Sequence, residues 1–426
     1  MVKRLCGFFA LGLALAVCTF FIYGVCGFAY AAEKTVKVGA IFPLSGGVAQ
    51  TGVLCKAAME IAQEIVNGKV DDILVPGATT EGFANLGAKL ELVFMDSQNV
   101  PEKAMSAAEQ LITQENVVAL LGCYTSATTA TASQAAERLG IPFLNESSTS
   151  PILTNRGFQW FFRCTPDDDF FTRNFFEFLR DEEAKGKNYG RSIAVLYENT
   201  LWGADVAKAV QKYAAEFDYK IIADVPYTAR AASLTSEVQQ IKSANADIVM
   251  LASYVSDAIL LQTTFRDLDY SPSIILAHDA GFNDPNFLKT VGSAGNYVLS
   301  REVYASTLLN KPSVKKLNEL MVAKTGYPLD GNSARALMGV LVLSDALLRT
   351  KSTEPDDLRQ ALLETDIPAE QVIFPWLGVK FDPETHQITT GRGIVVQIQD
   401  QNYIPVWPYE IAGADVLYPI PQWKDR

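Results

Sequence analysis

The chain has 426 residues, of which 49% are apolar and 20% charged, and it contains no low-complexity tract. This composition excludes a disordered chain and predicts two or three folded domains. The formal net charge of −12 argues against nucleic acid and anionic membrane surfaces as partners.

The N-terminus has the pattern of a secretory signal peptide. Two basic residues at 3–4 precede an apolar run over 5–28, and Ala29-Tyr30-Ala31 supplies a small-x-small cleavage site. A membrane anchor is the alternative, because the apolar run is long. A lipoprotein is a weaker one, since Cys18 and Cys26 each follow a valine. Cleavage would leave a net charge of −14, because the removed part holds two basic and no acidic residues.

Three cysteines remain after such cleavage, Cys55, Cys123 and Cys164. An odd number leaves at least one thiol without an intramolecular partner. Their spacing matches no zinc-binding pattern, so we interpret them as small buried residues with one disulfide at most.

The next part of the chain alternates between strand and helix patterns. Strands are predicted at 35–44, 88–96, 116–122 and 141–145, and helices at 52–68, 101–115 and 126–140. Residues 71–88 are rich in Gly, Thr and Ala and predict a surface loop.

The alternation then starts again. Strands are predicted at 191–199, 219–227, 247–254 and 272–279, and helices at 202–217, 233–246 and 256–269. Two such series predict two doubly wound α/β domains with parallel sheets covered on both faces.

The remaining part breaks this pattern. Residues 311–365 predict three helices, and short strands follow at 377–382, 393–400 and 403–410. We therefore expect the chain to cross between the domains more than once. The tail after Trp407 has no clear assignment.

Hydroxyl side chains follow two neighbouring strands of the first domain. Thr125 and Ser126 come after one apolar strand, and Ser147, Ser148 and Thr149 come after the next. Ligands of open parallel sheets bind at these carboxyl ends, and a helix that begins there offers free backbone N–H groups. With no Lys or Arg in either cluster, the pattern predicts a neutral site for a carboxylate. Taken singly, each residue could instead be a helix cap or turn residue.

Strand ends in the second domain carry Tyr254, His278 and Asp279. A carboxylate that faced the hydroxyl site would suit an ammonium group, and the two sites together would bind an α-amino acid. A turn cap at Asp279 and a half-buried aromatic at Tyr254 are the alternatives.

Several stretches together resemble the leucine/isoleucine/valine-binding proteins, the substrate-binding subunits of branched-chain amino acid ABC transporters. They are "VKVGAIFPLSGGVAQTG", "VVALLGCYTSATTATAS", "LGIPFLNESSTSP", "GVKFDPETHQ" and "VVQIQDQNYIPVWP", and they span Val36 to Trp407. The resemblance implies a type I periplasmic binding fold, with two doubly wound lobes joined by a three-segment hinge. The ranges we expect are a signal peptide at 1–31, an N-terminal lobe of 32–163 plus 303–376, and a C-terminal lobe of 164–302 plus 377–426.

The resemblance also implies which residues hold the ligand. Hydroxyls and backbone N–H groups of the first lobe would bind its carboxylate, an acidic residue and an aromatic hydroxyl its ammonium, and a second aromatic would pack beside it. The residues at the carboxylate would be Ser126, Ser147 and Thr149. The acidic residue would be Asp279 and the aromatic hydroxyl Tyr254. The second aromatic residue would be Trp202.

Two positions depart from the family pattern. Thr51 stands where branched-chain binders often carry an aromatic residue, and Thr125 stands where a disulfide-bonded cysteine can occur. The first change leaves room for a larger or more polar ligand, including an aromatic amino acid. The family also contains binders of amides, urea and aromatic acids.

We therefore expect a monomeric periplasmic protein that binds a small ligand, most simply an amino acid, and delivers it to a membrane ABC permease. We expect no catalysis, cofactor, metal or nucleic acid. A hydrolase built on His278 and Asp279 is the rival, but the chain has two histidines and no Gly-x-Ser-x-Gly elbow. The sensing domain of a receptor is another, for which the chain would need a transmembrane helix after the domain.

Overall fold

The computed structural model describes residues 34–305, 307–308 and 311–426. The predicted signal peptide at 1–31 lies outside these residues and stays a prediction. Among the helices described, none is both long and apolar enough to span a bilayer.

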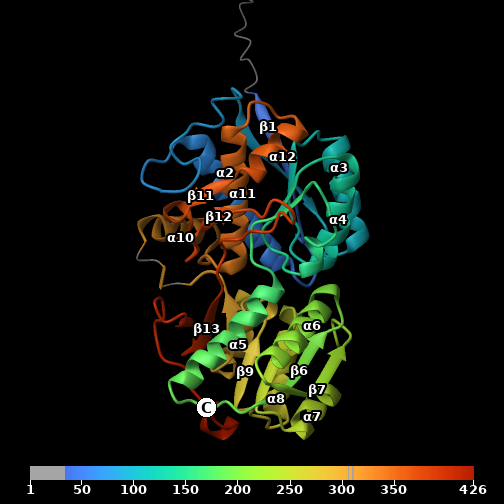
Figure 1. The fold of residues 1–426 in the computed structure, drawn as a ribbon, viewed down its shortest axis with the longest axis vertical. Coiled ribbons are helices and arrows are strands. Elements are labelled where there is room, and N and C mark those ends of the chain that lie inside the picture. Colours follow the sequence, from blue (N-terminus) through green and yellow to red (C-terminus); the bar gives the residue numbers. More distant parts are fainter. Residues whose placement is uncertain (1–33, 306, 309–310) are drawn as a thin grey trace, which may run out of the picture. The chain divides into compact units, whose positions relative to one another are not determined.

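The first sheet has five parallel strands in the order β2-β1-β3-β4-β5. The strands are β1 (Thr35–Phe42), β2 (Lys89–Asp96), β3 (Ala119–Gly122), β4 (Phe143–Asn145) and β5 (Phe161–Arg163). Their alternate residues face opposite sides, as the strand period of two requires. Val38 and Leu121 pack in one core with α2 (Ala49–Gly68) and α11 (Gly331–Arg349), whereas Leu120 packs in another with α3 (Pro101–Thr113) and α4 (Ser126–Leu139) (Figure 1).

The second sheet has seven strands in the order β14-β13-β10-β9-β8-β6-β7. They are β6 (Ser192–Glu198), β7 (Lys220–Tyr227), β8 (Ile248–Ala252), β9 (Ile274–Ala277), β10 (Leu299–Glu302), β13 (Ile394–Gln399) and β14 (Asn402–Trp407). Its first five strands along the chain are parallel, but β13 pairs antiparallel with β10 and with β14. The parallel sheet expected from the alternating pattern is therefore present, and the late strands β13 and β14 add an antiparallel edge to it.

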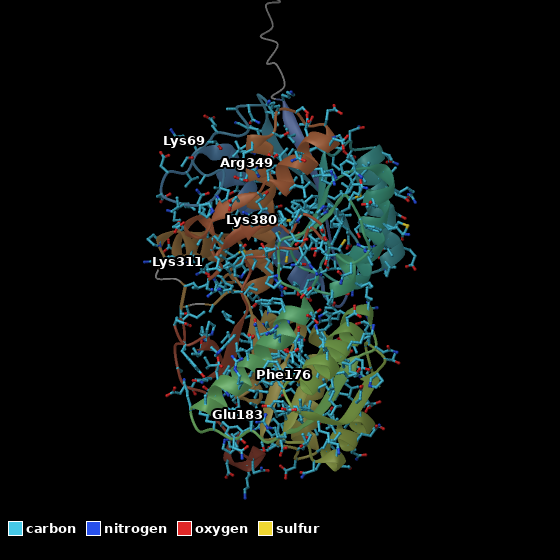
Figure 2. The ribbon with its side chains drawn as sticks, viewed as in Figure 1. Lys69, Phe176, Glu183, Lys311, Arg349 and Lys380 are labelled. Atoms are coloured by element: carbon cyan, nitrogen blue, oxygen red, sulfur yellow. The ribbon has the colours of Figure 1, made fainter. Side chains whose placement is uncertain are left out.

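Helices cover both faces of the second sheet. One face packs against α5 (Asp168–Ala184) and α6 (Leu201–Glu216), the other against α7 (Thr235–Ala244) and α8 (Val255–Asp267). Phe176 of α5, labelled in Figure 2, is fully buried in the first of these cores. No element was predicted over this helix, although Phe171, Phe175 and Phe178 are buried at helical spacing along it. Asp167 caps it by accepting the backbone N–H of Phe170.

The chain passes three times between the two sheets, after β5, after β10 and before β13. The second passage leads into α10 (Pro312–Thr325), α11 and α12 (Pro355–Leu363), whose apolar residues join the core of the first sheet. The third passage was predicted before residue 377, but it comes later. The strand β12 (Gly378–Lys380), which the prediction placed in the C-terminal lobe, pairs with β11 (Asp366–Pro368). Gln387 also forms a β-bridge with Arg163 of the first sheet. The passage therefore lies shortly before β13, and the other lobe ranges stay predictions.

Two smaller features complete the fold. The predicted loop 71–88 is irregular, yet Ile73, Val75 and Phe83 are buried in the core of the first sheet. Cys55, Cys123 and Cys164 are unpaired and buried. Burial raises the pKa of each of these thiols, so we infer that they pack as small apolar residues.

Candidate functional site

The N-terminus of α4 opens at the carboxyl end of β3. Its N-cap residue, Thr125, makes no side-chain capping bond, because its hydroxyl donates to Asn99 Oδ1 at 2.7 Å. The N–H groups of the first turn, from Ser126 onward, thus receive no acceptor from the cap. They are free to bind an anion, and the helix dipole favours one.

The second hydroxyl loop, residues 146–151, is tied to this helix end. Ser148 Oγ donates to the carbonyl of Cys123 at 2.9 Å, and the backbone N–H of Ser150 donates to Ser126 Oγ at 3.3 Å. The hydroxyl of Ser148 is therefore committed to this contact, although Ser148 lines the cavity described below together with Ser147 and Thr149.

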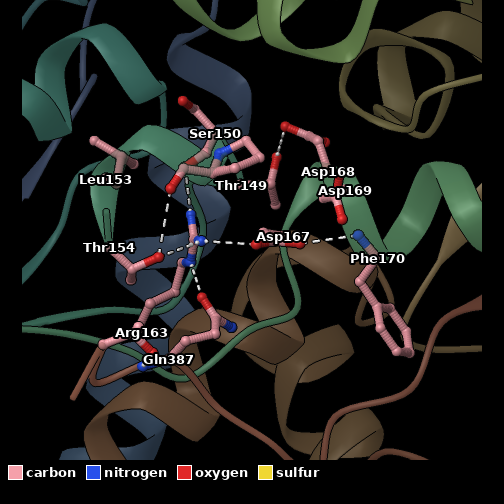
Figure 3. Close-up of polar contacts among 12 residues, drawn as sticks. Thr149, Ser150, Leu153, Thr154, Arg163, Asp167, Asp168, Asp169, Phe170 and Gln387 are labelled. Atoms are coloured by element: carbon pink, nitrogen blue, oxygen red, sulfur yellow. Dashed lines mark hydrogen bonds and ion pairs between the residues drawn. The ribbon is translucent and has the colours of Figure 1, made fainter. Parts of the chain in front are cut away.

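Arg163 holds the same loop through hydrogen bonds and an ion pair (Figure 3). Its guanidinium is fully buried and donates to the carbonyl of Ser150 at 2.6 Å, to Thr154 Oγ1 at 3.1 Å and to Asp167 Oδ2 at 3.3 Å. Its Nε donates to Gln387 Oε1 at 2.5 Å, which ties in the last segment before the third passage. The loop is thus held rigidly by a charge that does not reach the ligand cavity.

Asp279 follows β9 and precedes a short 3-10 helix, η2 (Ala280–Phe282). Its Oδ2 accepts from Arg301 Nη1 at 2.9 Å and from Arg335 Nη2 at 3.2 Å. All three side chains are buried. Within the described residues, Oδ1 takes part in no hydrogen bond or ion pair, so one oxygen of this carboxylate is without a polar partner.

Arg301, on β10, connects the two halves of the site. Besides Asp279, it donates to Asp168 Oδ1 at 2.8 Å and to Thr149 Oγ1 at 3.2 Å, and its guanidinium lies over the ring of Phe171. Burial raises the pKa of Asp168 to about 6, and Arg301 counteracts this. Two carboxylates and two guanidiniums thus balance in charge. The expectation of a site without Lys or Arg was wrong, because both arginines come from elements that the analysis did not connect with it.

Aromatic rings form the wall of the site. Trp202 of α6 and Tyr254, at the start of α8, have ring centroids 4.9 Å apart, and Tyr124 meets Tyr254 edge-on at 5.7 Å. Trp202 Nε1 donates to Asp168 Oδ1 at 3.4 Å. The wall is therefore anchored to the same ionic network.

All six residues named from the sequence line one narrow cavity of about 20 Å³. The others around it are Tyr124, Ser148, Ala280, Asn332 and Arg335. A wider groove of about 600 Å³ lies beyond Trp202 and Tyr254, which line both spaces. The structure thus brings the predicted residues together, with a larger space next to them.

Three charged residues of the site escaped the sequence analysis, Asp168, Arg301 and Arg335. A signal for two of them exists. Arg301 stands in a buried strand, and Arg335 in a helix stretch that is otherwise apolar, "ALMGVLVL" following it directly. A charged side chain in a buried element needs a partner of opposite charge or a hydrogen-bond partner. The partners of Arg301 are 22, 133 and 152 residues away in sequence, so the sequence does not identify them.

Two other positions from the sequence analysis lie outside this cavity. Thr51 Oγ1 donates to Asp284 Oδ2 at 2.6 Å and does not line the cavity. His278 is buried with neither ring nitrogen bonded, so it forms no triad with Asp279 and a serine. Over the part of the chain that the structure describes, no cluster of His, Cys, Asp and Glu is suited to a metal.

The model of a protein family, described as "Periplasmic binding protein", matches residues 35–402. The chain belongs to the periplasmic binding protein family. The proteins of this family are periplasmic binding proteins, and the match covers most of the chain. A curated relative, the Leu/Ile/Val-binding protein homolog 7 of Brucella suis biovar 1 (strain 1330), is 28% identical over 395 residues, which cover 91% of this chain and 95% of the relative. The resemblance inferred from the sequence is confirmed.

Solved structures show the same fold in this periplasmic binding protein. The substrate-binding protein LivJ from Streptococcus pneumoniae, in complex with isoleucine, aligns with a TM-score of 0.73 and 20% identity, over 91% of this chain and 100% of its own. A solute-binding protein from R. palustris, in complex with 4-hydroxybenzoate, aligns with a TM-score of 0.73 and 17% identity, over 92% and 99%. The type I periplasmic binding fold predicted from the sequence is confirmed, while these neighbours differ in ligand class.

Proposed function

We propose that this periplasmic binding protein captures an α-amino acid with an apolar or aromatic side chain and delivers it to a membrane ABC permease. One observation carries the proposal. A single cavity has free helix amides and hydroxyls at one end and an unpaired carboxylate oxygen, Asp279 Oδ1, near the other.

The carboxylate end is the better defined of the two. The first-turn N–H groups of α4 lack a capping side chain, and Ser126, Ser147 and Thr149 present hydroxyls beside them. A carboxylate there would accept several hydrogen bonds and the favourable dipole of the helix. Thr149 Oγ1 already donates to Asp168 at 2.9 Å and Ser147 Oγ to Glu146 Oε1 at 3.4 Å, so Ser126, whose hydroxyl only accepts, would contribute most.

The ammonium end depends on the unequal use of the two oxygens of Asp279. Both guanidinium contacts are to Oδ2, which leaves Oδ1 as the acceptor for an ammonium. The arginines hold this carboxylate in place without occupying both oxygens. The side chain of the ligand would then extend along Trp202 and Tyr254 toward the wider groove.

A second candidate is an aromatic acid without an ammonium group. Arg335 lines the cavity and could turn from Asp279 to a ligand carboxylate, and a structural neighbour from R. palustris carries 4-hydroxybenzoate. We favour the amino acid because two guanidiniums are already matched by two carboxylates, Asp168 and Asp279. An added anion alone would leave a buried negative charge without a partner.

The mode of action we propose is hinge closure of a monomer in the periplasm. Contacts made by Thr149 and Thr51 of the first sheet unit with Arg301 and Asp284 of the second would form only when the two approach. A ligand that touches both would favour this closed state, which the permease would recognise.

Titration calorimetry of refolded, ligand-free protein against a panel of amino acids and aromatic acids tests the proposal. We expect an apolar or aromatic amino acid to bind, and Ser126→Ala to weaken it about 10- to 100-fold through the loss of a hydrogen bond to a charged group. Ser236→Ala is the matched control, because Ser236 is also in the first turn of a helix but exposed and distant from the cavity. Tighter binding of aromatic acids than of every amino acid would contradict the proposal.

A further inference from the structure

A second cavity, of about 320 Å³, lies beside the passage from β10 to α10. Its walls include Leu288, Tyr304, Tyr327 and Leu329, together with Tyr403 of β14. It shares no lining residue with the amino acid cavity. The mixture of apolar and aromatic walls with a few polar groups is typical of small-molecule sites.

Glu302, at the end of β10, is the acidic group of this cavity without a partner. Its side chain is only 6% exposed, Oε2 has no hydrogen-bond partner, and no ion pair involves this carboxyl group in the described part of the chain. The fold makes room for it, because a Cβ added to Gly331 would lie 1.6 Å from Glu302 Oε1. A buried carboxyl group with no partner is costly and is uncommon without a functional reason.

The other polar groups of the cavity narrow the chemistry of a ligand. Asp330 is committed to the N-terminus of α11, where it accepts the backbone N–H of Ser333 at 2.8 Å. Asn283 donates to the carbonyl of Arg301 at 2.9 Å, but its Oδ1 is buried and without a partner. Lys and Arg are absent from the described lining. The buried lining atoms without a partner are therefore both acceptors, Glu302 Oε2 and Asn283 Oδ1, and three tyrosines share the lining with them.

We propose that this cavity binds a small organic cation, a primary or substituted ammonium with an apolar or aryl group. The ammonium would pair with Glu302 and donate to Asn283 Oδ1, and the apolar group would pack among Tyr304, Tyr327 and Leu329. Burial raises the pKa of the Glu302 carboxyl to about 8, with Arg335 opposing the shift, so a bound cation would also favour its ionised form.

A titration of the chain without its signal segment with 2-phenylethylammonium, and with the neutral 2-phenylethanol as its analogue, tests this. We expect the amine to bind at least tenfold more tightly than the alcohol. Glu302→Gln should reduce the affinity for the amine at least tenfold, whereas Glu319→Gln should not, since Glu319 is exposed on the neighbouring α10. Ser126→Ala should leave the affinity unchanged, because it alters the other cavity.

Three results would overturn the proposal. They are equal binding of amine and alcohol, an amine affinity unchanged in Glu302→Gln, and no binding of the amine at millimolar concentration. If Glu302→Gln does not fold, a crystal soaked in 2-(4-bromophenyl)ethylammonium gives an independent answer. The bromine should lie between Leu288 and Tyr327, and a bromine found only beside Trp202 would place the amine in the amino acid cavity and refute the second site. None of these outcomes depends on which amino acid the first cavity binds.

Discussion

A single oxygen of Asp279 accepts hydrogen bonds from two buried arginines, and this determines the effect of a substitution at Asp279. Asp279→Ala would remove the shared partner of Arg301 and Arg335, which are themselves buried. Removing one member of a buried ionic network typically costs about 3–5 kcal/mol, because the remaining charge stays buried without compensation. A loss of ligand binding in this variant would therefore mix two causes.

We predict that Asp279→Ala lowers the free energy of unfolding by about 3–5 kcal/mol, measured by urea denaturation of the ligand-free protein. Asp267→Ala is the control, because Asp267 pairs with Arg266 on the surface, and such pairs contribute about 0–1 kcal/mol. If the two variants were equally stable, the network around Asp279 would not be formed in solution.

Site residues that directly follow strand ends could be predicted from the sequence. Site residues that are brought together only by the tertiary fold could not. Ser126 and Thr149 could be found because hydroxyl clusters at neighbouring strand ends share an edge of the sheet. Arg301 could not, because nothing local to β10 indicates Asp168, 133 residues earlier in the chain.

Among the elements, η2 and the start of α8 approach each other closely at the site. A Cβ added to Gly281 would lie 2.4 Å from the backbone carbon of Tyr254 and 2.5 Å from the backbone nitrogen of Val255. Only glycine allows this approach, which sets Asp279 and Tyr254 beside one cavity.

We predict that Gly281→Ala weakens ligand binding at least tenfold and lowers stability by about 1–3 kcal/mol, since backbone atoms must move to admit the methyl group. Gly68→Ala is the control, because an added Cβ there meets nothing within 4 Å at the end of α2, and alanine is favoured in helices. Calorimetric titration and urea denaturation of both variants measure the two effects. Unchanged binding in Gly281→Ala would show that this approach does not position the site.

Elements with a strong period were predicted well, such as α2, α3 and the strands β1 and β6. The helix α5 was not, because its apolar residues are mainly phenylalanines whose burial depends on the second sheet and not on local propensity. The strands β5 and β10 are only three and four residues long. They are strands because they pair with neighbouring strands, and their sequences alone did not predict them.

At the scale of the whole molecule, three buried glutamates give folding a dependence on pH. Burial raises the pKa of Glu146, Glu198 and Glu302 to about 8 each. In the unfolded chain these groups titrate near 4.3. Between these values the folded state holds more protons than the unfolded state, so stability must fall as pH rises.

We predict that the free energy of unfolding decreases from pH 5 to pH 8, by at most about 1.4 kcal/mol per pH unit for each group. Glu146→Gln should reduce this slope, because the amide imitates the protonated carboxyl group and does not titrate. Urea denaturation at several pH values measures both. A stability that is constant or rises over this range would contradict the buried positions of these glutamates.

The overall topology could be predicted in outline. Two doubly wound units follow from the two series of alternating elements, as observed. The antiparallel edge of the second sheet and the late third passage could not be read from local pattern, because the strand pattern of β12 and β13 does not show that β12 pairs with β11 and β13 with β10.

The claim that one cavity holds both ends of an amino acid is tested most directly by chemical removal of each end. The amino acid that binds most tightly should be compared by calorimetry with its analogue lacking the amino group and with its carboxamide. We predict that each analogue binds at least about a hundredfold more weakly, because each leaves a buried polar partner without its charge. If the analogue without the amino group bound as tightly as the amino acid, Asp279 would have no part in recognition and the central claim would be refuted.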